Sequence, residues 1–387
     1  SGETCNYNFE TRWDLSKSIG SGATQIQFNV SFFNEAVYTW QEISPGNAFG
    51  TGTLAYGSNT ITGLPANSII ELSISPTNLW RFYIDNGPDK LRLVGIENWG
   101  TSYWASMNGA FYGCENMIYS ATDYPNFLYV RDMRNMFRSC SLFDGNITTW
   151  DTRNITDMSF MFSDASNFNQ NIDSWNTSSV TSFSSMFSGA TAFNQNLGSW
   201  TLNAAVNMKN MLNNSGINCT NYSNTLIGWS NNPTTPNDIS LGATGLEYGT
   251  YALAARANLN DTKNWTLTGD VASGNFCSDN FVTLWNLANT GSGATQIKFS
   301  ATANAFTPYT WQEISPGSAK GSGALAYGTS VRTITGLPVN AIIQLSIETN
   351  PYISLQRFYI NSGADRLRLV DVENWGSATW TSMSAAF

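Results

Sequence analysis

Apolar residues recur along the middle of the chain at intervals of 25 or 26 positions. One set is phenylalanine, a second is methionine and a third is tryptophan, and all three keep the same phase. A fixed apolar period of about 20 to 29 residues is typical of solenoids, in which successive coils bury the same side chains one above the next. We therefore expect stacked coils whose interior columns contain Met136, Met161, Met186, Phe137, Phe162, Phe187, Trp150, Trp175 and Trp200.

Polar residues keep the same period. The stretch "FNQNIDSW" begins at Phe168 and "FNQNLGSW" begins at Phe193. Amide side chains at one phase of adjacent coils can bond to the neighbouring coil, which satisfies polar groups along the stack. The sequence therefore predicts amide ladders that connect Asn169, Gln170 and Asn171 with Asn194, Gln195 and Asn196.

A different pattern lies on either side of the coils. Short alternating runs such as "TQIQFNV", "VYTWQEI" and "IIELSIS" follow one another at close spacing, with Gly, Pro and Asn between them. This pattern predicts a small antiparallel β-sandwich. Trp40 and Trp311 fall in the middle of such runs, and we expect them in the core, as in an immunoglobulin-like or PKD-like domain. A carbohydrate-binding platform is the alternative for these two side chains.

A longer repeat contains both patterns. "GSGATQIQF" at Gly20 returns as "GSGATQIKF" at Gly291, and "YTWQEISPG" at Tyr38 returns at Tyr309. The expected division is a sandwich over 1–95, a solenoid of about five coils with a closing cap over 96–270, a second sandwich over 271–371 and the start of another solenoid over 372–387. We expect the chain to be a window in a longer array of alternating modules, in which neighbouring repeats of the same chain contact one another.

Composition limits the functions that this segment can have. The chain has 387 residues, no histidine, 12% charged residues and a formal net charge of -9. An acidic chain without a Lys/Arg cluster is a poor nucleic-acid binder. The lack of histidine excludes the usual nucleophile pairs and proton shuttle, and no carboxylate pair for hydrolysis stands out, so we expect no enzyme. No apolar run reaches the roughly 20 residues that a membrane-spanning helix needs.

One pair of carboxylates is a candidate metal-binding site. Asp132 and Asp157 share a phase of consecutive coils, so their side chains could lie about 5 Å apart and attract Ca²⁺. Arg131, Arg134 and Arg153 lie close by in the sequence. Turn capping with local ion pairing is therefore the preferred interpretation, and a calcium site is the alternative. We expect no other cofactor.

The chain has five cysteines, but each period of the longer repeat contains an even number of them. Cys5 and Cys277 hold the same position in successive units, so one period contains four. Cys114 and Cys140 share a phase of adjacent coils, whose spacing suits a disulfide, and the remaining pair is Cys219 with Cys277. Cys5 would then bond to the preceding repeat. Four cysteines allow three pairings, and four buried free thiols are a further alternative.

The repeats resemble a known family. The phrases "FNQNIDSWNTSSVTSFSSMFSGATAFNQNLGSW", "NTLIGWSNNP" and "YGTYALAARANL" are similar to the BspA-like variant of the leucine-rich repeat in bacterial surface proteins of Bacteroidota. The resemblance covers about Ile96 to Asp270. The fold class that we expect for the whole chain is mixed and β-rich: an immunoglobulin-like β-sandwich alternating with a leucine-rich-repeat-like right-handed solenoid. The resemblance implies export to the cell surface and a role in adhesion, with no catalytic residue.

Three functions are compatible with this reading. The preferred one is the stalk of a giant secreted adhesin that attaches to surfaces, cells or polysaccharides, with a likeness to the mobile adhesins of gliding cells. A purely structural surface fibre or surface-layer protein is the second. A polysaccharide-binding appendage of a surface enzyme is the third.

Overall fold

A computed structural model describes residues 7–18, 20–33, 35–77, 79–249, 252–273, 277, 280–303, 305–349, 355–360, 363–374, 376 and 380. The chain divides into two compact units, Ser1–Glu247 with Ala252–Val271 and Tyr248–Tyr251 with Ala272–Phe387. The fold is β-rich and contains several sheets, and none of those formed by the described residues closes into a barrel. The finer division of the first unit into 1–95 and 96–270 stays a prediction, and most of the expected segment 372–387 lies outside the described residues.

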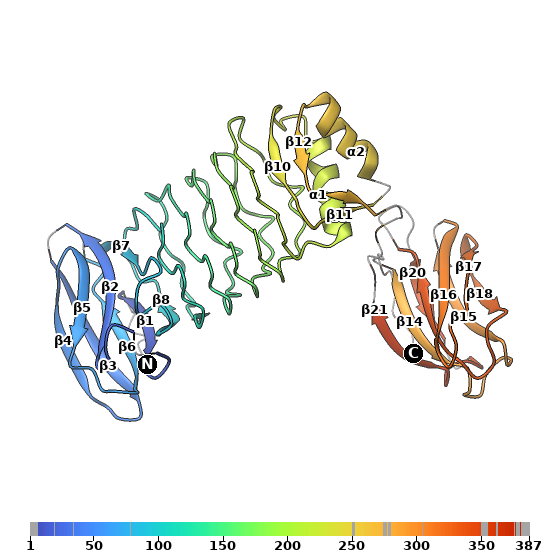
Figure 1. Ribbon diagram of the computed structural model, residues 1–387, viewed down its shortest axis with the longest axis horizontal. Helices are drawn as coiled ribbons and strands as arrows, with labels where there is room; N and C mark the ends of the chain where they lie inside the picture. Colours follow the sequence, from blue (N-terminus) through green and yellow to red (C-terminus); the bar gives the residue numbers. More distant parts are fainter. Residues whose placement is uncertain are drawn as a thin grey trace, which may run out of the picture. The chain divides into compact units, whose positions relative to one another are not determined.

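The first unit begins with two sheets, here called the first sheet pair, which are antiparallel except where β8 pairs with β9 (Figure 1). The larger sheet has the strand order β4-β3-β6-β1-β8-β9 and the smaller one β5-β2-β7. Fully and partly buried positions alternate along β1, β6 and most of β2, because every second side chain of a strand faces the core. The strands are β1 (Phe9–Asp14), β2 (Gln25–Phe32), β3 (Ala36–Ser44), β4 (Phe49–Leu54), β5 (Gly57–Thr62), β6 (Ile69–Ile74), β7 (Leu79–Tyr83), β8 (Leu93–Asn98) and β9 (Ile118–Tyr119).

Aromatic rings from both sheets form the core between them. Phe9 on β1 lies 5.1 Å from Phe82 on β7, and Trp13 on β1 lies 5.8 Å from Phe28 on β2, measured between ring centroids. Trp13 is fully buried, and its indole N–H donates to the Thr11 hydroxyl at 2.9 Å. A buried indole N–H group needs an acceptor, and strand β1 provides one for Trp13 two residues earlier in the same strand.

A buried ion pair anchors the loop that precedes β2. Arg92 and Asp89 are almost fully buried and lie 3.3 Å apart. The Arg92 guanidinium donates to the backbone carbonyls of Ser18, Gly22 and Gln25, while Asp89 accepts from Ser21 and from the Gln27 backbone N–H. Each charge is therefore both paired and hydrogen-bonded, as a buried charge must be.

Successive coils follow the first sheet pair and form what we call the coil stack, residues 103–217 (Figure 1). The backbone N–H of each phased phenylalanine donates to the carbonyl of a methionine one coil further on, at 2.9 Å in every case. Parallel bridges also run along one edge, from Asp132 to Asp157, to Ser182 and to Asn207. The stack is therefore held by backbone hydrogen bonds at the repeat period. These coil-to-coil bonds are Phe111 to Met136, Phe137 to Met161, Phe162 to Met186 and Phe187 to Met211.

The interior of the coil stack consists of aromatic and methionine columns. Phe137, Phe162 and Phe187 are fully buried, with 5.8 Å between successive ring centroids and near-parallel planes. Each indole of Trp175 and Trp200 donates to an isoleucine carbonyl of the preceding coil at 3.1 Å. Trp150, Met136, Met161 and Met186 are buried in the same interior.

The amide ladder runs along the surface of the coil stack. Gln195 donates its side-chain N–H to both the carbonyl and the side-chain oxygen of Asn169, at 3.0 and 2.7 Å. Gln170 makes the same pair of bonds to Asp144, and Asn221 makes them to Asn194. The predicted ladder is confirmed for Asn169 with Asn194 and Gln195, at an exposed edge of the stack. It is wrong for Asn171 and Asn196, which accept from the backbone N–H groups of Asp173 and Gly198 in their own coils.

The last coil is followed by helices and short strands. Asn218 caps α1, because its side chain accepts from the backbone N–H of Asn221. Arg256 holds Asp270 through two hydrogen bonds of 2.8 Å, and the Asp270 side chain is fully buried. This segment contains α1 (Cys219–Asn231), β10 (Ser240–Gly242), β11 (Glu247–Tyr248), α2 (Leu253–Ala257), the π-helix η2 (Asn258–Thr262), β12 (Thr266–Thr268) and β13 (Val271–Ala272).

The cysteines follow the predicted pairing in part. Cys219 and Cys277 form a disulfide, as expected. The predicted bond between Cys114 and Cys140 is wrong, because both are buried free thiols. The Cys140 thiol instead donates to the Phe111 carbonyl at 3.0 Å, and burial raises the pKa of both cysteines, which keeps them protonated and unreactive. Cys5 lies outside the described residues.

The second unit repeats the sheet pair, with strand orders β17-β16-β19-β14-β21 and β18-β15-β20. Trp285 is fully buried and its indole donates to Thr283, as Trp13 does to Thr11. Asp365 and Arg368 repeat the buried ion pair, also at 3.3 Å. Its strands are β14 (Phe281–Asn286), β15 (Gln296–Ala303), β16 (Thr307–Ser315), β17 (Lys320–Leu325), β18 (Gly328–Thr335), β19 (Ile342–Ile347), β20 (Leu355–Tyr359) and β21 (Leu369–Asn374).

Candidate binding grooves

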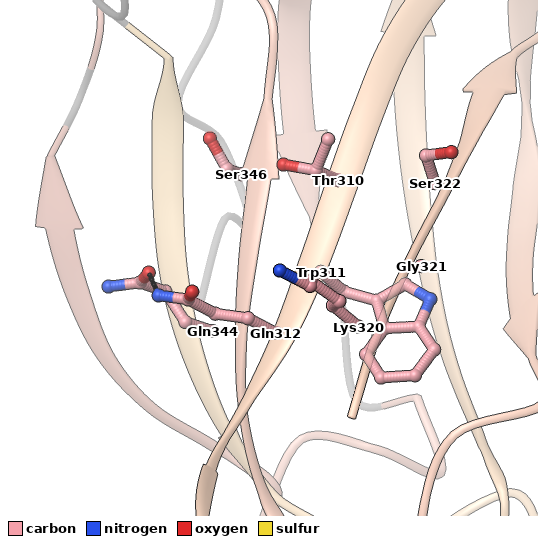
Figure 2. A pocket seen from close by; sticks show the side chains of 8 residues that line it. All are labelled: Thr310, Trp311, Gln312, Lys320, Gly321, Ser322, Gln344 and Ser346. Atoms are coloured by element: carbon pink, nitrogen blue, oxygen red, sulfur yellow. Dashed lines mark hydrogen bonds between the residues drawn. The ribbon is translucent and has the colours of Figure 1, made fainter. Parts of the chain in front are cut away.

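A shallow groove of about 490 Å³ lies over three strands of the second unit, and we call it the Trp311 groove. Thr310 and Gln312 on β16 are directly opposite Ser346 and Gln344 on β19, so these four side chains share one face of the sheet. Gln312 donates its amide N–H to Gln344 at 2.6 Å. Figure 2 shows the residues that line the groove: Thr310, Trp311, Gln312, Lys320, Gly321, Ser322, Gln344 and Ser346.

Glycines on β17 make room for the aromatic residues of β16. Trp311 pairs with Gly321 and Tyr309 pairs with Gly323 across the ladder. A Cβ atom at Gly321 would lie 2.7 Å from the indole Nε1 of Trp311, and one at Gly323 would lie 2.4 Å from the Tyr309 hydroxyl. Both approaches are closer than a side chain tolerates, so each ring lies directly against glycine backbone.

The same groove occurs in the first sheet pair, where we call it the Trp40 groove. It has a volume of about 580 Å³ and is lined by Thr39, Trp40, Gln41, Asn47, Phe49, Gly50 and Thr51. Trp40 pairs with Gly50 and Thr39 with Thr51, which is the register of Trp311 with Gly321 and of Thr310 with Ser322. The two grooves therefore share a threonine, a tryptophan and a glutamine on one strand, opposite a glycine and a hydroxyl on the next.

A carboxylate fixes the turn beside each groove. Glu42, which is buried, accepts from the backbone N–H of Ala48 at 3.1 Å across the β3–β4 turn. Glu313 accepts from the backbone N–H groups of Gly317 and Ala319 at 3.0 and 3.1 Å in the equivalent turn. These bonds set the path of the turn and therefore the position of the edge strand that carries the glycines.

The chemistry of the grooves suits binding through hydroxyl and amide groups. The threonine and glutamine side chains of each groove are neutral donors and acceptors on the outer face of the sheet, whereas the tryptophan between them points to the opposite face. These polar side chains match ligands rich in hydroxyl groups. Lys320 adds a positive charge to the Trp311 groove, at the position where the Trp40 groove has the exposed ring of Phe49. Burial raises the pKa of Tyr38 and of Tyr309, so both phenols beside the grooves stay neutral at pH 7.

The expectation that Trp40 and Trp311 are core tryptophans holds in part, because Trp311 packs against the core of the second unit and Trp40 is opposite the buried Leu72. Both are only partly buried, and the fully buried tryptophans of the sheet pairs are Trp13 and Trp285. Trp40 and Trp311 lie on the strand next to the edge strand, which has glycine opposite each indole. The opposing glycine has no side chain to complete the burial of the ring, which explains the difference.

The carboxylates considered for calcium lie beside an arginine. Asp132 and Asp157 are bridged neighbours in adjacent coils, as their phase predicts. Arg134 lies 2.8 Å from Asp132 and 3.6 Å from Asp157, and the Asp132 carboxylate raises the pKa of Arg134. Each aspartate also accepts from a backbone N–H two residues further on. A guanidinium therefore occupies the position that a cation would take, and the described residues contain no group of three or more acidic, Cys or His side chains arranged to hold a metal.

Sequence reasoning missed the strand pairing that creates the grooves. The signal that identifies it is the alternation of aromatic residues in "YTW" with alternating glycines in "FGTGTL" and "KGSGAL". In the observed hairpin register, the aromatic residues of one strand pair with the glycines of the other, so each ring is opposite a glycine.

Comparison with known proteins gives one match. Residues 105–225 match the family described as "Mycoplasma protein of unknown function, DUF285", and this supports a bacterial surface-protein family for that part of the chain. No curated protein and no solved structure matches the chain. Among the described residues, no helix is both long and apolar enough to cross a bilayer. The matched residues fall within the coil stack and α1, so the family resemblance belongs to the segment between the two sheet pairs.

Proposed function

We propose that this chain is a segment of an adhesive bacterial surface protein that attaches to surfaces, cells or polysaccharides through a binding groove repeated in each sheet pair. The observation that carries the proposal is the recurrence of one groove, with the same threonine, tryptophan, glutamine and glycine, in two sheet pairs of one chain. Individual grooves this shallow would bind weakly. Two or more on one chain raise the overall affinity by about 10²- to 10⁴-fold when they engage one surface together.

In this proposal the architecture serves as a stalk. We assign the sheet pairs to an immunoglobulin-like sandwich and the coil stack to a right-handed, leucine-rich-repeat-like solenoid, and we place the protein outside the cell. The match to a surface-protein family and the disulfide between Cys219 and Cys277 support an extracellular location, because structural disulfides persist in oxidising compartments. A giant array of such units, as in adhesins of gliding cells, would present many grooves.

A glycan array tests the proposal directly. The chain as it stands is applied to immobilised polysaccharides beside a variant with four exposed groove residues removed: Thr39→Ala, Gln41→Ala, Thr310→Ala and Gln312→Ala. We expect the natural sequence to bind neutral glycans and the variant to lose this binding, with an unchanged melting temperature because all four side chains are exposed. Failure of the natural sequence to bind any glycan, cell or abiotic surface contradicts the proposal and favours a purely structural fibre.

A further inference from the structure

A pocket of about 270 Å³ lies in the first unit, apart from the grooves, and we call it the Trp80 pocket. It forms where the outer face of the β5-β2-β7 sheet meets the first coil. The backbone N–H of Ala105 donates to the Trp80 carbonyl at 2.9 Å, which joins the two elements. Its lining residues are Ser31, Tyr56, Trp80, Arg81, Ala105 and Ser106.

Aromatic rings form the apolar side of this pocket. Trp80 stacks on Phe33, with 4.9 Å between ring centroids and 20° between planes, and Phe33 is 75% exposed. Tyr56, which also lines the pocket, is 69% exposed. Exposed rings that remain partly uncovered offer flat apolar faces, and the C–H face of a pyranose ring packs on such faces while its hydroxyls stay free for hydrogen bonds.

Arg81 supplies a positive charge to the pocket. Within the described residues, its guanidinium makes one hydrogen bond, from Nη2 to the Asn108 carbonyl at 2.8 Å, and lies 3.9 Å from the centroid of Tyr83, with no carboxylate partner. Among the described residues, neither the Nε of Arg81 nor the indole Nε1 of Trp80 has an acceptor, and both atoms are shielded from water. Arg81 is the charged residue of the lining, and a carboxylate that enters the pocket would gain a charge-assisted interaction with its guanidinium.

The size of the pocket limits the ligand. Its volume lies just below the lower bound of about 300 Å³ for pockets that take drug-sized ligands, which suits one sugar ring of a longer chain. Hydroxyls of Ser31, Tyr56 and Ser106 line it beside the guanidinium. A ring that carries both hydroxyls and a carboxylate would use every one of these groups.

We propose that the Trp80 pocket binds a uronic acid residue of an acidic polysaccharide, with the ring against Trp80 and Tyr56 and the carboxylate at Arg81. This inference rests on the proposed adhesive function and names its ligand class at a site separate from the grooves. The second sheet pair has Gln356 in place of Trp80 and Thr302 in place of Ser31, although it retains Tyr327 and Arg357. The first sheet pair is therefore the one specialised for acidic sugars.

Calorimetry with two matched probes tests the proposal. The probes are a trimer of galacturonic acid and a trimer of galactose, which differ in the carboxylate. We expect the natural chain to bind the acidic trimer and to bind the neutral one about tenfold or more weakly, because a carboxylate contributes a charge-assisted bond to Arg81. Trp80→Gln, which installs the residue of the second sheet pair, should weaken acidic-trimer binding by about tenfold, since it removes one aromatic face.

The outcomes separate this site from the grooves. Absence of binding, equal binding of both trimers, or an unchanged affinity in Trp80→Gln overturns the proposal. If the melting curve shows that Trp80→Gln does not fold, Arg81→Gln carries the test, and it should abolish the preference for the acidic trimer. Polysaccharide binding that survives Trp80→Gln but disappears in the four-residue groove variant leaves the adhesive function standing and places its ligand site in the grooves alone.

Discussion

Removal of one ring from the phenylalanine column should destabilise the coil stack severely. Phe162 is fully buried, and its ring centroid lies 3.9 Å from that of Phe168 in the same coil and 5.8 Å from those of Phe137 and Phe187 in adjacent coils. A buried Phe→Ala change costs about 3 to 5 kcal/mol, and aromatic pairs add about 0.5 to 1.5 kcal/mol each beyond burial. The measured range for Phe→Ala already includes part of this pair energy. We therefore place Phe162→Ala at about 4 to 5 kcal/mol, in the upper half of that range, because four stacked contacts are lost, with Phe137, Phe143, Phe168 and Phe187.

The measurement is urea unfolding, with hydrogen exchange to locate the effect. A matched control is Leu142→Ala, a half-exposed residue of the same coil region, which should cost under about 1 kcal/mol. Exchange of the Phe137 backbone N–H, which bonds to Met161 in the damaged coil, should accelerate, while amides of β14 to β21 should not change. A loss of under about 1 kcal/mol for Phe162→Ala, or acceleration spread evenly over both units, would refute the reasoning that coils bury one another through this column.

Three further predictions concern single residues. Cys219→Ser removes the disulfide to Cys277, which closes a loop of 58 residues, and should lower the free energy of unfolding by about 4 kcal/mol through loop-closure entropy. Thermal unfolding with and without reductant checks this, and equal stability of the oxidised and reduced proteins contradicts it. Asp89→Asn leaves the buried Arg92 without its carboxylate and should lower the free energy of unfolding in urea by about 3 to 5 kcal/mol. A loss below about 1 kcal/mol would show that the ion pair is dispensable. Burial first, and then two neighbouring glutamates, raise the pKa of Glu71, so its ionised form is disfavoured in the folded state and the free energy of unfolding should fall as pH rises from 4.5 through the raised pKa. The second sheet pair has Gln344 at the equivalent position, so Glu71→Gln should raise the melting temperature at pH 7 and leave it unchanged at pH 3.5. A rise at both pH values would refute the ionisation of Glu71 as the cause.

The coil stack could be predicted from the sequence because its determinants are local and periodic. A coil that stacks on its neighbours must present the same side chains inward, so the spacing of Phe137, Phe162 and Phe187 is a direct record of the contacts. The ladder from Gln195 to Asn169 follows from the same period. The same period did not predict correctly whether Cys114 and Cys140 form a disulfide. A shared phase in adjacent coils places two Cα atoms near each other but does not direct the thiols toward one another.

The sheet pairs were harder to predict because their cores depend on strand order. Trp13 and Trp40 occupy similar alternating runs, and only the order β4-β3-β6-β1-β8 shows that Trp13 lies on a central strand while Trp40 lies next to an edge strand. The Trp80 pocket combines β2, β7, a turn and the first coil, contacts between segments far apart in the sequence. The difference between Trp80 and Gln356 in the two repeats is the sequence signal that points to it.

The dissociation rate of the chain from a polysaccharide-coated sensor tests the central claim, that grooves repeated along one chain hold a surface together. The comparison is between the natural sequence and a variant with Thr310→Ala and Gln312→Ala, which damages the Trp311 groove and leaves the Trp40 groove intact. We predict that the variant still binds but dissociates at least about tenfold faster, because it has lost multivalent attachment. Equal dissociation rates for the two proteins would contradict the claim.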